Sequence, residues 1–322
     1  MVEAMTAYPQ NWLLNKGIAA VLEQCGELEG RLEIIDRRAN IEASTFPSEI
    51  VTCQLDGQRV VRLFCKYSID LDREVHGHRG GVKYEARVYH RVLQQIELSV
   101  PRFYGSYIEP KSNRTWLVLA YLADTVRVSR TPNPDALLKA AQWLGFFHAD
   151  NEAHLKQEEL AFLHRYDADY YLGWSRRALS FAKGSRSLSW LHPLCARFET
   201  QVGELLTAPL TVIHGEFYPQ NVLVHDGAPY PVDWESAAIA VGELDLACLT
   251  DRWPEQIARR CETRYQETRW QDLSSEGFHQ RLQIARIYTQ LRWLGDWFEV
   301  SVKDCDWRLE QLRDLGLRLG YL

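Results

Sequence analysis

The stretch that decides the interpretation of this chain reads HGEFYPQN at residues 214–221 and is followed by PVDWE at residues 231–235. It supplies a carboxylate at Glu216, a carboxamide at Asn221 and a second carboxylate at Asp233. Phosphoryl transfer requires oxygen ligands for Mg²⁺ and a carboxylate that faces the attacking hydroxyl. The spacing from Glu216 to Asn221 is that of the D-x-x-x-x-N pattern in kinase catalytic loops. The pattern therefore predicts a kinase site with Glu216 as base and Asn221 and Asp233 as metal ligands.

Short apolar segments flank this stretch and predict the local backbone. Residues 210–213, 222–224 and 230–232 are expected to be strands. The Asp226-Gly227 pair between the last two segments is a hairpin signal. A strand, a polar loop and a hairpin in this order are expected to bring both metal ligands to one edge of a small sheet.

The block from residue 210 to residue 249 resembles the aminoglycoside phosphotransferase and choline kinase family of small-molecule kinases. In that family the loop reads H-G-D-x-x-x-x-N, the metal aspartate lies in an I-D-W/F-E-like segment, and D-L-A follows. The residues of this chain that match are His214, Gly215, Asn221, Asp233, Trp234, Glu235, Asp245, Leu246 and Ala247. Each match alone is weak, but together at these spacings they are specific. The resemblance extends more loosely over most of the chain from near residue 40.

The resemblance implies an α+β, protein-kinase-like fold with two lobes. The N-lobe, residues 1–123, would be an antiparallel sheet with one main helix and would bind the nucleotide. The C-lobe, residues 124–322, would be larger and mainly helical, and would carry the catalytic loop and the acceptor site. The implied cofactors are ATP and Mg²⁺, with ATP between the lobes. The implied acceptor is a hydroxyl of a small molecule, such as an aminoglycoside-like antibiotic, an amino alcohol or a sugar.

One position departs from the family pattern where the chemistry is most sensitive. Glu216 stands where the family has aspartate, which keeps the carboxylate but lengthens its arm by one methylene group. Because a misplacement of about 1 Å is costly in catalysis, two interpretations stay open. Either Glu216 still orients and deprotonates an acceptor hydroxyl, or the chain is a nucleotide-binding pseudokinase with a regulatory or binding role.

The upstream half contains candidates for the phosphate-binding lysine and its partner. Residues 50–66 read as an apolar hairpin with a turn at Asp56-Gly57-Gln58, and the hairpin ends on Lys66. Residues 82–93 have the composition of a helix and contain Glu85. In the kinase pattern such a lysine meets the α and β phosphates and a glutamate of the next helix orients it. We therefore expect Lys66 and Glu85 to form this pair.

Two further nucleotide contacts follow from the resemblance alone. Residues 41–49 occupy the place of a glycine-rich phosphate loop but contain no G-x-G-x-x-G, so Ser44 is the candidate for contacts to phosphate. Tyr121 lies where the family has the hinge whose backbone pairs with adenine. The absence of the glycine pattern also keeps open a third interpretation, a phosphate-free binding module on the same scaffold.

Several polar and aromatic residues are expected to serve the structure rather than the chemistry. His148 is expected to pack at the end of a helix that begins near residue 136, and His214 to hold the backbone of the catalytic loop. Asp245 resembles the family aspartate that caps a helix and bonds amides of that loop. Four aromatic residues of 278–300 could cage an ammonium group, but their helical spacing favours a core role; they are Tyr288, Trp293, Trp297 and Phe298. Tyr170, Tyr171 and Trp174 could line the cleft, with a core role equally open.

Composition is that of an ordinary globular protein. The chain has 322 residues, 46% hydrophobic and 25% charged, and a formal net charge of −6. This charge argues against a nucleic-acid-binding protein and mildly favours a cationic acceptor. No apolar run is long enough to span a membrane, and seven cysteines without a C-x-x-C pair indicate reduced thiols. These features predict a cytoplasmic protein; the oligomeric state stays open.

Overall fold

The computed structural model describes residues 8–42, 45–69, 76–77, 79–131, 133–183, 185–270, 276–296 and 306–322. Over these residues the chain forms two compact units. Unit 1 comprises Met1–Arg73, Arg79–Val126 and Leu223–Ser236, and unit 2 comprises Glu74–His78, Arg127–Val222 and Ala237–Leu322. The segment Leu223–Ser236, which contains Asp233, thus returns to unit 1, whereas a single division at residue 123 assigns it to the C-lobe.

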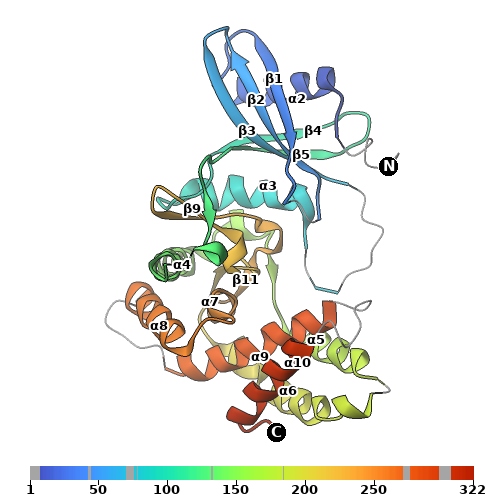
Figure 1. The fold of residues 1–322 in the computed structure, drawn as a ribbon, viewed down its shortest axis with the longest axis vertical. Coiled ribbons are helices and arrows are strands. Elements are labelled where there is room, and N and C mark those ends of the chain that lie inside the picture. Colours follow the sequence, from blue (N-terminus) through green and yellow to red (C-terminus); the bar gives the residue numbers. More distant parts are fainter. Residues whose placement is uncertain are drawn as a thin grey trace. The chain divides into compact units, whose positions relative to one another are not determined.

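The helices and strands follow one another in a strand-rich first part and a helix-rich second part (Figure 1). Unit 1 contains α2 (Asn11–Gln24), β1 (Leu32–Ala39), β2 (Ser48–Leu55), β3 (Arg59–Tyr67), α3 (Gly81–Arg91), η1 (Leu93–Gln95), β4 (Phe103–Ile108), β5 (Thr115–Ala120), β10 (Ala228–Pro231) and η6 (Trp234–Ser236). The chain passes between the units within β6 (Val126–Arg127) and at the start of β9 (Val222–His225). Unit 2 contains η2 (Val128–Arg130), α4 (Asp135–His154), η3 (Glu158–Leu160), β7 (His164–Arg165), α5 (Ala168–Phe181), η4 (Arg186–Leu188), α6 (Leu191–Thr207), β8 (Leu210–Ile213), η5 (Pro219–Asn221), β11 (Ala238–Val241), α7 (Glu243–Thr250), α8 (Glu255–Trp270), α9 (Phe278–Asp296) and α10 (Asp306–Arg318).

The main sheet of unit 1 has the order β1-β2-β3-β5-β4, with every neighbouring pair antiparallel. The turn between β2 and β3 places Asp56 at φ 52° and Gly57 at φ 70°. Two consecutive residues with positive φ are the signature of the hairpin turn whose twist matches that of the strands. The hairpin predicted from the sequence is therefore confirmed, and it carries Lys66 near the end of β3.

Helices α2 and α3 cover opposite faces of this sheet. Cys65 and Tyr67 of β3 belong to the apolar core that the sheet forms with α2. Side chains alternate between the faces of a strand, so Lys66 points to the other face. There it contacts Glu85 of α3. The alternation of β3 thus sends its one lysine to the helix that carries the glutamate, as the sequence predicted.

The predicted strands around the loop are present, and they belong to two small sheets. The segments predicted at 210–213 and 222–224 are strands β8 and β9, and β9 forms the predicted hairpin with β10. Strand β8 belongs to the sheet β7-β11-β8, and β9 to the sheet β10-β9-β6. The two are separate because the apolar strand β11, which follows Asp233, pairs antiparallel with β8.

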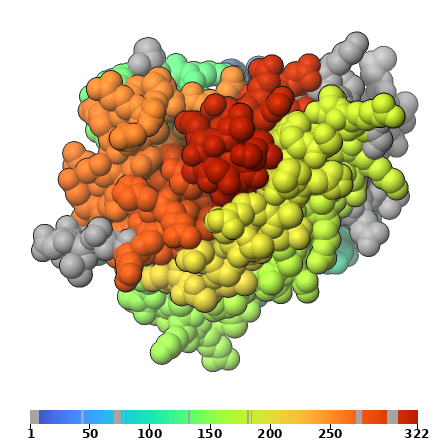
Figure 2. Space-filling model, turned by 90° about the horizontal axis from the view of Figure 1, so that it is seen from below, coloured from blue at the N-terminus to red at the C-terminus, as the bar shows by residue number. Residues whose placement is uncertain are grey.

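Unit 2 is built from helices packed around α7. Every residue of α7 is buried, and α7 packs against α4, α8 and α9. Helix α5 packs against α6 and α9, while α4 packs against α8 and β8. Figure 2 shows α10, in red, on the surface between the orange helices and the yellow-green segment of α5 and α6. There Gly316 of α10 lies so near Leu194 of α6 that an added Cβ would come within 2.8 Å of it.

The described residues include free cysteine thiols and no helix that could span a membrane. Six cysteines carry free thiols, and all but Cys25 are buried. None of the described helices is both long enough and apolar enough to cross a bilayer.

The close contact between α2 and the sheet predicts that one methyl group added at Gly17 destabilises the folded protein. A Cβ added at Gly17 would lie 2.3 Å from Cζ3 of Trp116. We expect Gly17→Ala to lower the free energy of unfolding by about 1–3 kcal/mol, because overpacking outweighs the better helix propensity of alanine. Gly203→Ala on α6 is the matched control, since nothing lies within 4 Å of its added Cβ. Urea denaturation would contradict the expectation if both variants were equally stable.

Candidate active site

A buried lysine is the centre of the charged cluster in unit 1. Nζ of Lys66 donates to Oε2 of Glu85 at 2.7 Å and to Oδ1 of Asp233 at 2.5 Å. Oε2 of Glu235 lies 4.0 Å from the same Nζ. The other carboxylate oxygen of Glu85 accepts the backbone N–H of Trp234 at 3.2 Å. The structure therefore brings three predicted residues, Lys66, Glu85 and Asp233, into direct contact.

Carboxylates dominate the surroundings of this lysine. Burial opposes the charge of Lys66, but the carboxylates of Glu85, Asp233 and Glu235 outweigh it and raise the pKa of the ammonium group. Burial raises the pKa of Glu85, and Lys66 partly offsets this effect. Three carboxylates thus lie within 4.0 Å of one ammonium group. Carboxylate oxygens are also the ligands that hard divalent cations prefer.

Asp233 is held in a backbone conformation that few non-glycine residues adopt. Its φ is 71°, in the left-handed region, directly after the hairpin β9-β10. The next residues form η6, where Trp234 is fully buried and donates its indole N–H to the carbonyl oxygen of Pro231 at 3.2 Å. The side chain of Asp233 remains 36% exposed. A strained backbone that presents a partly exposed carboxylate beside a buried lysine is typical of functional sites.

The catalytic loop of unit 2 is ordered by hydrogen bonds within the loop itself. Gly215 has φ 81°, and the backbone N–H of Glu216 donates to Nδ1 of His214 at 3.2 Å. The carbonyl oxygen of Glu216 accepts the N–H of Tyr218 at 2.7 Å and Nδ2 of Asn221 at 3.0 Å. This last bond uses the amino group of Asn221 as a donor within the loop, so the atom of this side chain that can bind a cation is its amide oxygen. The structure brings Glu216 and Asn221 together in one loop.

A buried aspartate anchors the start of this loop. Oδ2 of Asp245 accepts the N–H of His214 at 2.6 Å, and Oδ1 accepts the N–H of Gly215 at 2.9 Å. The predicted bonds to loop amides are therefore confirmed. The predicted capping role is wrong, because α7 begins at Glu243 with Gly242 as its N-cap residue, which places Asp245 in the first turn.

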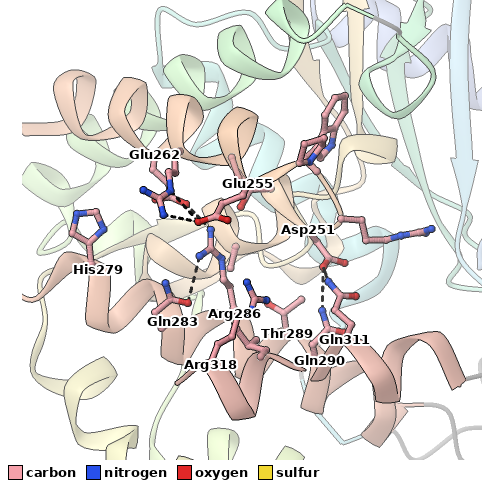
Figure 3. A pocket seen from close by; sticks show the side chains of 18 of the residues that line it. Asp251, Glu255, Glu262, His279, Gln283, Arg286, Thr289, Gln290, Gln311 and Arg318 are labelled. Carbon is pink, nitrogen blue, oxygen red and sulfur yellow. Dashed lines mark hydrogen bonds and ion pairs between the residues drawn. The ribbon is translucent and has the colours of Figure 1, made fainter. Parts of the chain in front are cut away.

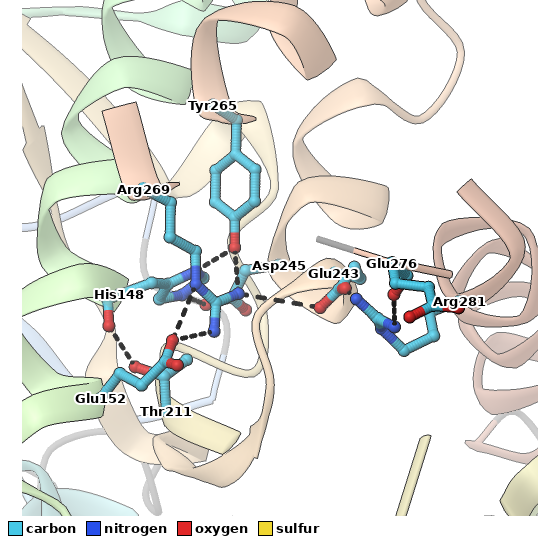
Figure 4. A network of polar contacts seen from close by, with 9 residues as sticks. All are labelled: His148, Glu152, Thr211, Glu243, Asp245, Tyr265, Arg269, Glu276 and Arg281. Atoms are coloured by element: carbon cyan, nitrogen blue, oxygen red, sulfur yellow. Dashed lines mark hydrogen bonds and ion pairs between the residues drawn. The ribbon is translucent and has the colours of Figure 1, made fainter. Parts of the chain in front are cut away.

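Asp245 is itself the end of a directed chain of buried polar groups (Figure 4). Nε2 of His148 lies 3.3 Å from Oδ2 of Asp245, and Nδ1 of His148 lies 2.8 Å from the hydroxyl of Tyr265. That hydroxyl accepts Nη1 of Arg269 at 2.6 Å, and Arg269 also donates to Glu152 at 2.7 Å. An ionised carboxylate only accepts, so the histidine proton is on Nε2 and Tyr265 donates to Nδ1. The expected structural role of His148 agrees with these contacts.

An arginine that the sequence interpretation gave no role contacts Glu216. Nη2 of Arg292, on α9, donates to Oε1 of Glu216 at 2.7 Å, and Nη1 donates to the carbonyl oxygen of Gly215 at 2.7 Å. A signal for this residue was present in the sequence. Arg292 lies among apolar positions of its helix, such as Leu291 and Leu294, and a charged side chain on an apolar face requires a partner.

The remaining predicted residues contribute less. Ser44 lies outside the described residues, as do Trp297 and Phe298. The backbone N–H of Tyr121 donates to the carbonyl oxygen of Arg62 at 3.0 Å, which leaves only its carbonyl group for a hinge contact. The aromatic residues of α5 and α9 that the structure describes mostly pack together: Tyr171, Trp174 and Tyr288 are each at most 2% exposed, and the hydroxyl groups of Tyr170 and Tyr288 lie 3.0 Å apart.

Unit 2 also contains a polar cavity of about 880 Å³ between α7, α8, α9 and α10 (Figure 3). Asp251 accepts hydrogen bonds there from Gln290 at 3.1 Å and Gln311 at 2.9 Å. Arg286 pairs with Glu262 at 2.5 Å on the same wall. These side chains satisfy one another, so the cavity indicates no particular ligand.

The buried histidine predicts a pH dependence of stability. Burial lowers the pKa of His148 below its usual 6.5, so the unfolded chain takes up this proton more readily than the folded one. The contribution is fully present above about pH 6.5 and decreases below it, with a slope of at most about 1.4 kcal/mol per pH unit.

We therefore expect His148→Gln to reduce the loss of unfolding free energy between pH 7 and pH 5. His154→Gln, at the exposed end of the same helix, is the control. Equal slopes for the parent and His148→Gln in urea denaturation at each pH would show that His148 is not responsible.

Comparisons with known proteins agree with the fold described above. No curated protein sequence matches the chain. Among solved structures, choline kinase LicA from Streptococcus pneumoniae is similar with a TM-score of 0.58 and 15% identity, covering 94% of this chain and 98% of that one. A thermostable mutant of an aminoglycoside phosphotransferase has a TM-score of 0.63 and 13% identity, covering 93% of this chain and 98% of that one. Amicoumacin kinase hAmiN, in complex with AMP-PNP, Ca²⁺ and its ligand, has a TM-score of 0.65 and 10% identity, covering 98% of this chain and 96% of that one.

These likenesses confirm the α+β, protein-kinase-like fold. The family comparison covers more than half of the chain, and it includes the catalytic loop, Asp233 and Asp245. Residues 56–278 match the model of the phosphotransferase enzyme family, and the chain therefore belongs to that family.

Proposed function

We propose that this protein is an ATP-dependent kinase that transfers the γ-phosphate to a hydroxyl group of a small molecule. The observation that carries the proposal is the contact of one buried ammonium group, that of Lys66, with both Glu85 and Asp233. A helix glutamate that orients a strand lysine next to a metal aspartate is the arrangement that phosphoryl transfer uses.

Mg²⁺ is the cation that this donor set fits. The carboxylate of Asp233 and the amide oxygen of Asn221 are hard oxygen ligands, and Mg²⁺ binds through few protein ligands together with phosphate oxygens. When bound, the ion would neutralise charge on the transferred phosphoryl group. Lys66 would then exchange part of its contact with Asp233 for contact with the α and β phosphates. The AMP-PNP and Ca²⁺ in the amicoumacin kinase complex support a nucleotide and a divalent ion.

Glu216 would orient the acceptor hydroxyl and accept its proton. Its loop fixes the backbone on both sides of the carboxylate through Asp245 and Asn221. The acceptor classes we propose are aminoglycoside-like antibiotics, amino alcohols and sugars, because the similar structures include a choline kinase and an aminoglycoside phosphotransferase. The free thiols of the described residues are compatible with an enzyme of the cytoplasm.

Nucleotide binding is tested without knowing the acceptor. Mg²⁺-ATP at 100 times its Kd should stabilise the folded protein by about 2.7 kcal/mol, seen as a rise in Tm. Lys66→Met should abolish this rise, because it removes the group that meets the phosphates. Mg²⁺-GTP in parallel decides the nucleotide. The absence of any nucleotide-dependent stabilisation would favour a phosphate-free binding module.

Turnover is tested by acceptor-dependent release of ADP across aminoglycosides, macrolides, choline, sugars and amino alcohols. We expect Asp233→Asn to eliminate turnover, because the metal ligand loses its charge, and Glu216→Asp to retain part of it. An Asp233→Asn variant as active as the parent would contradict the site assignment. Stabilisation by Mg²⁺-ATP without ADP release on any acceptor would favour a pseudokinase.

A further inference from the structure

The contact between Arg292 and the catalytic loop has no counterpart in the sequence pattern that defines the site. Arg292 is 5% exposed, and its guanidinium group bridges a backbone carbonyl, that of Gly215, and the side chain of the next residue, Glu216. The bridge therefore ties the carboxylate to the backbone of its own loop. Burying an arginine is costly, so a guanidinium placed here requires a compensating contact that its partners supply.

We propose that Arg292 is a positioning residue that holds the carboxylate of Glu216 in place. The inference rests on the proposed function, in which Glu216 faces the acceptor hydroxyl. The longer side chain of glutamate has one more rotatable bond than aspartate and would otherwise sample several positions. A planar guanidinium group with two anchors selects one of them.

The surroundings of Arg292 make this a fixed element. Helix α9, which carries it, packs against α5, α6 and α7. Its guanidinium carbon lies 6.0 Å from the centre of the Trp174 ring of α5. The neighbouring residue of α9, Trp293, packs against Tyr218 of the catalytic loop, with 5.9 Å between ring centres. Two successive residues of α9 thus contact the same loop.

The side chain of Glu216 is more exposed than that of Arg292. It is 13% exposed, whereas that of Arg292 is 6% exposed. The arginine therefore contacts the carboxylate from the buried side.

The first experiment needs no acceptor. In a crystal structure of full-length Arg292→Gln, we expect the carboxylate of Glu216 to occupy more than one position, because the group that anchors it is gone. In Arg292→Lys we expect it to stay in the parent position. A single, parent-like position of the carboxylate in Arg292→Gln would overturn the proposal.

The second experiment measures kcat and KM for the acceptor found in the ADP-release screen. Arg292→Gln should lower kcat on the order of 10- to 100-fold and leave KM for ATP unchanged. Arg292→Lys should recover part of kcat. Arg286→Gln is the matched control on the same helix, since Arg286 also pairs with a glutamate but contacts Glu262 instead of the loop; it should match the parent.

The two proposals fail in different ways. A parent without acceptor-dependent ADP release on any compound overturns the proposed function and the positioning role with it. A parent that is active while Arg292→Gln has the same kcat overturns the positioning role alone. A folding defect in Arg292→Gln would appear in its melting curve, and Arg292→Lys then decides by whether it retains kcat.

Discussion

The buried carboxylate of Asp245 is the constraint on which the catalytic loop depends. It accepts two successive backbone N–H groups, those of His214 and Gly215, and so fixes the direction in which the loop leaves β8. Behind it, His148, Tyr265 and Arg269 continue as a chain of hydrogen bonds. The hydroxyl of Tyr265 can donate to Nδ1 of His148 only if the imidazole is neutral, and burial lowers the pKa of His148. The position of Glu216 is therefore set by groups remote from the substrate.

A buried cation contacts carboxylates in each unit, but the surroundings differ. Lys66 in unit 1 lies within 4.0 Å of three carboxylates. Arg292 in unit 2 contacts one carboxylate, that of Glu216, and a backbone carbonyl. The oxygen-rich surroundings of Lys66 fit the metal and phosphate site proposed there. The contact of Arg292 joins a side chain to the backbone of its own loop, which suits a role in orientation.

Much of this could be predicted from the sequence where the signal is local. The hairpin that ends on Lys66 and the loop from His214 to Asn221 depend on short-range turn chemistry and spacing, and both agree with the structure. The contact of Lys66 with Glu85 was predicted from the kinase pattern. The alternation of side chains along β3 explains why Lys66 points to the helix that carries Glu85.

What could not be predicted depends on pairing between distant segments. Strand β11 has four residues, and nothing in them specifies β8 as the partner. We predicted that Asp245 caps α7, but the N-cap residue is Gly242. The sequence does not separate the two roles, because a helix-capping aspartate and a buried aspartate that accepts loop amides are the same residue type. Arg292 and Glu216 are 76 residues apart, so only the packing of α9 against the loop reveals their contact.

The ion pair also bears on whether glutamate at position 216 is compatible with catalysis. A carboxylate paired with arginine is a weak base, yet a loose phosphoryl-transfer transition state leaves little proton transfer to be done before the phosphoryl group has moved. The demand on the residue is then mainly orientation, which the bridge from Arg292 to Gly215 and Glu216 supplies. A pseudokinase has no use for that precision, and a buried ion pair is seldom better for stability than apolar packing. The charged contact at this point of α9 therefore suits the catalytic role that we propose for the loop.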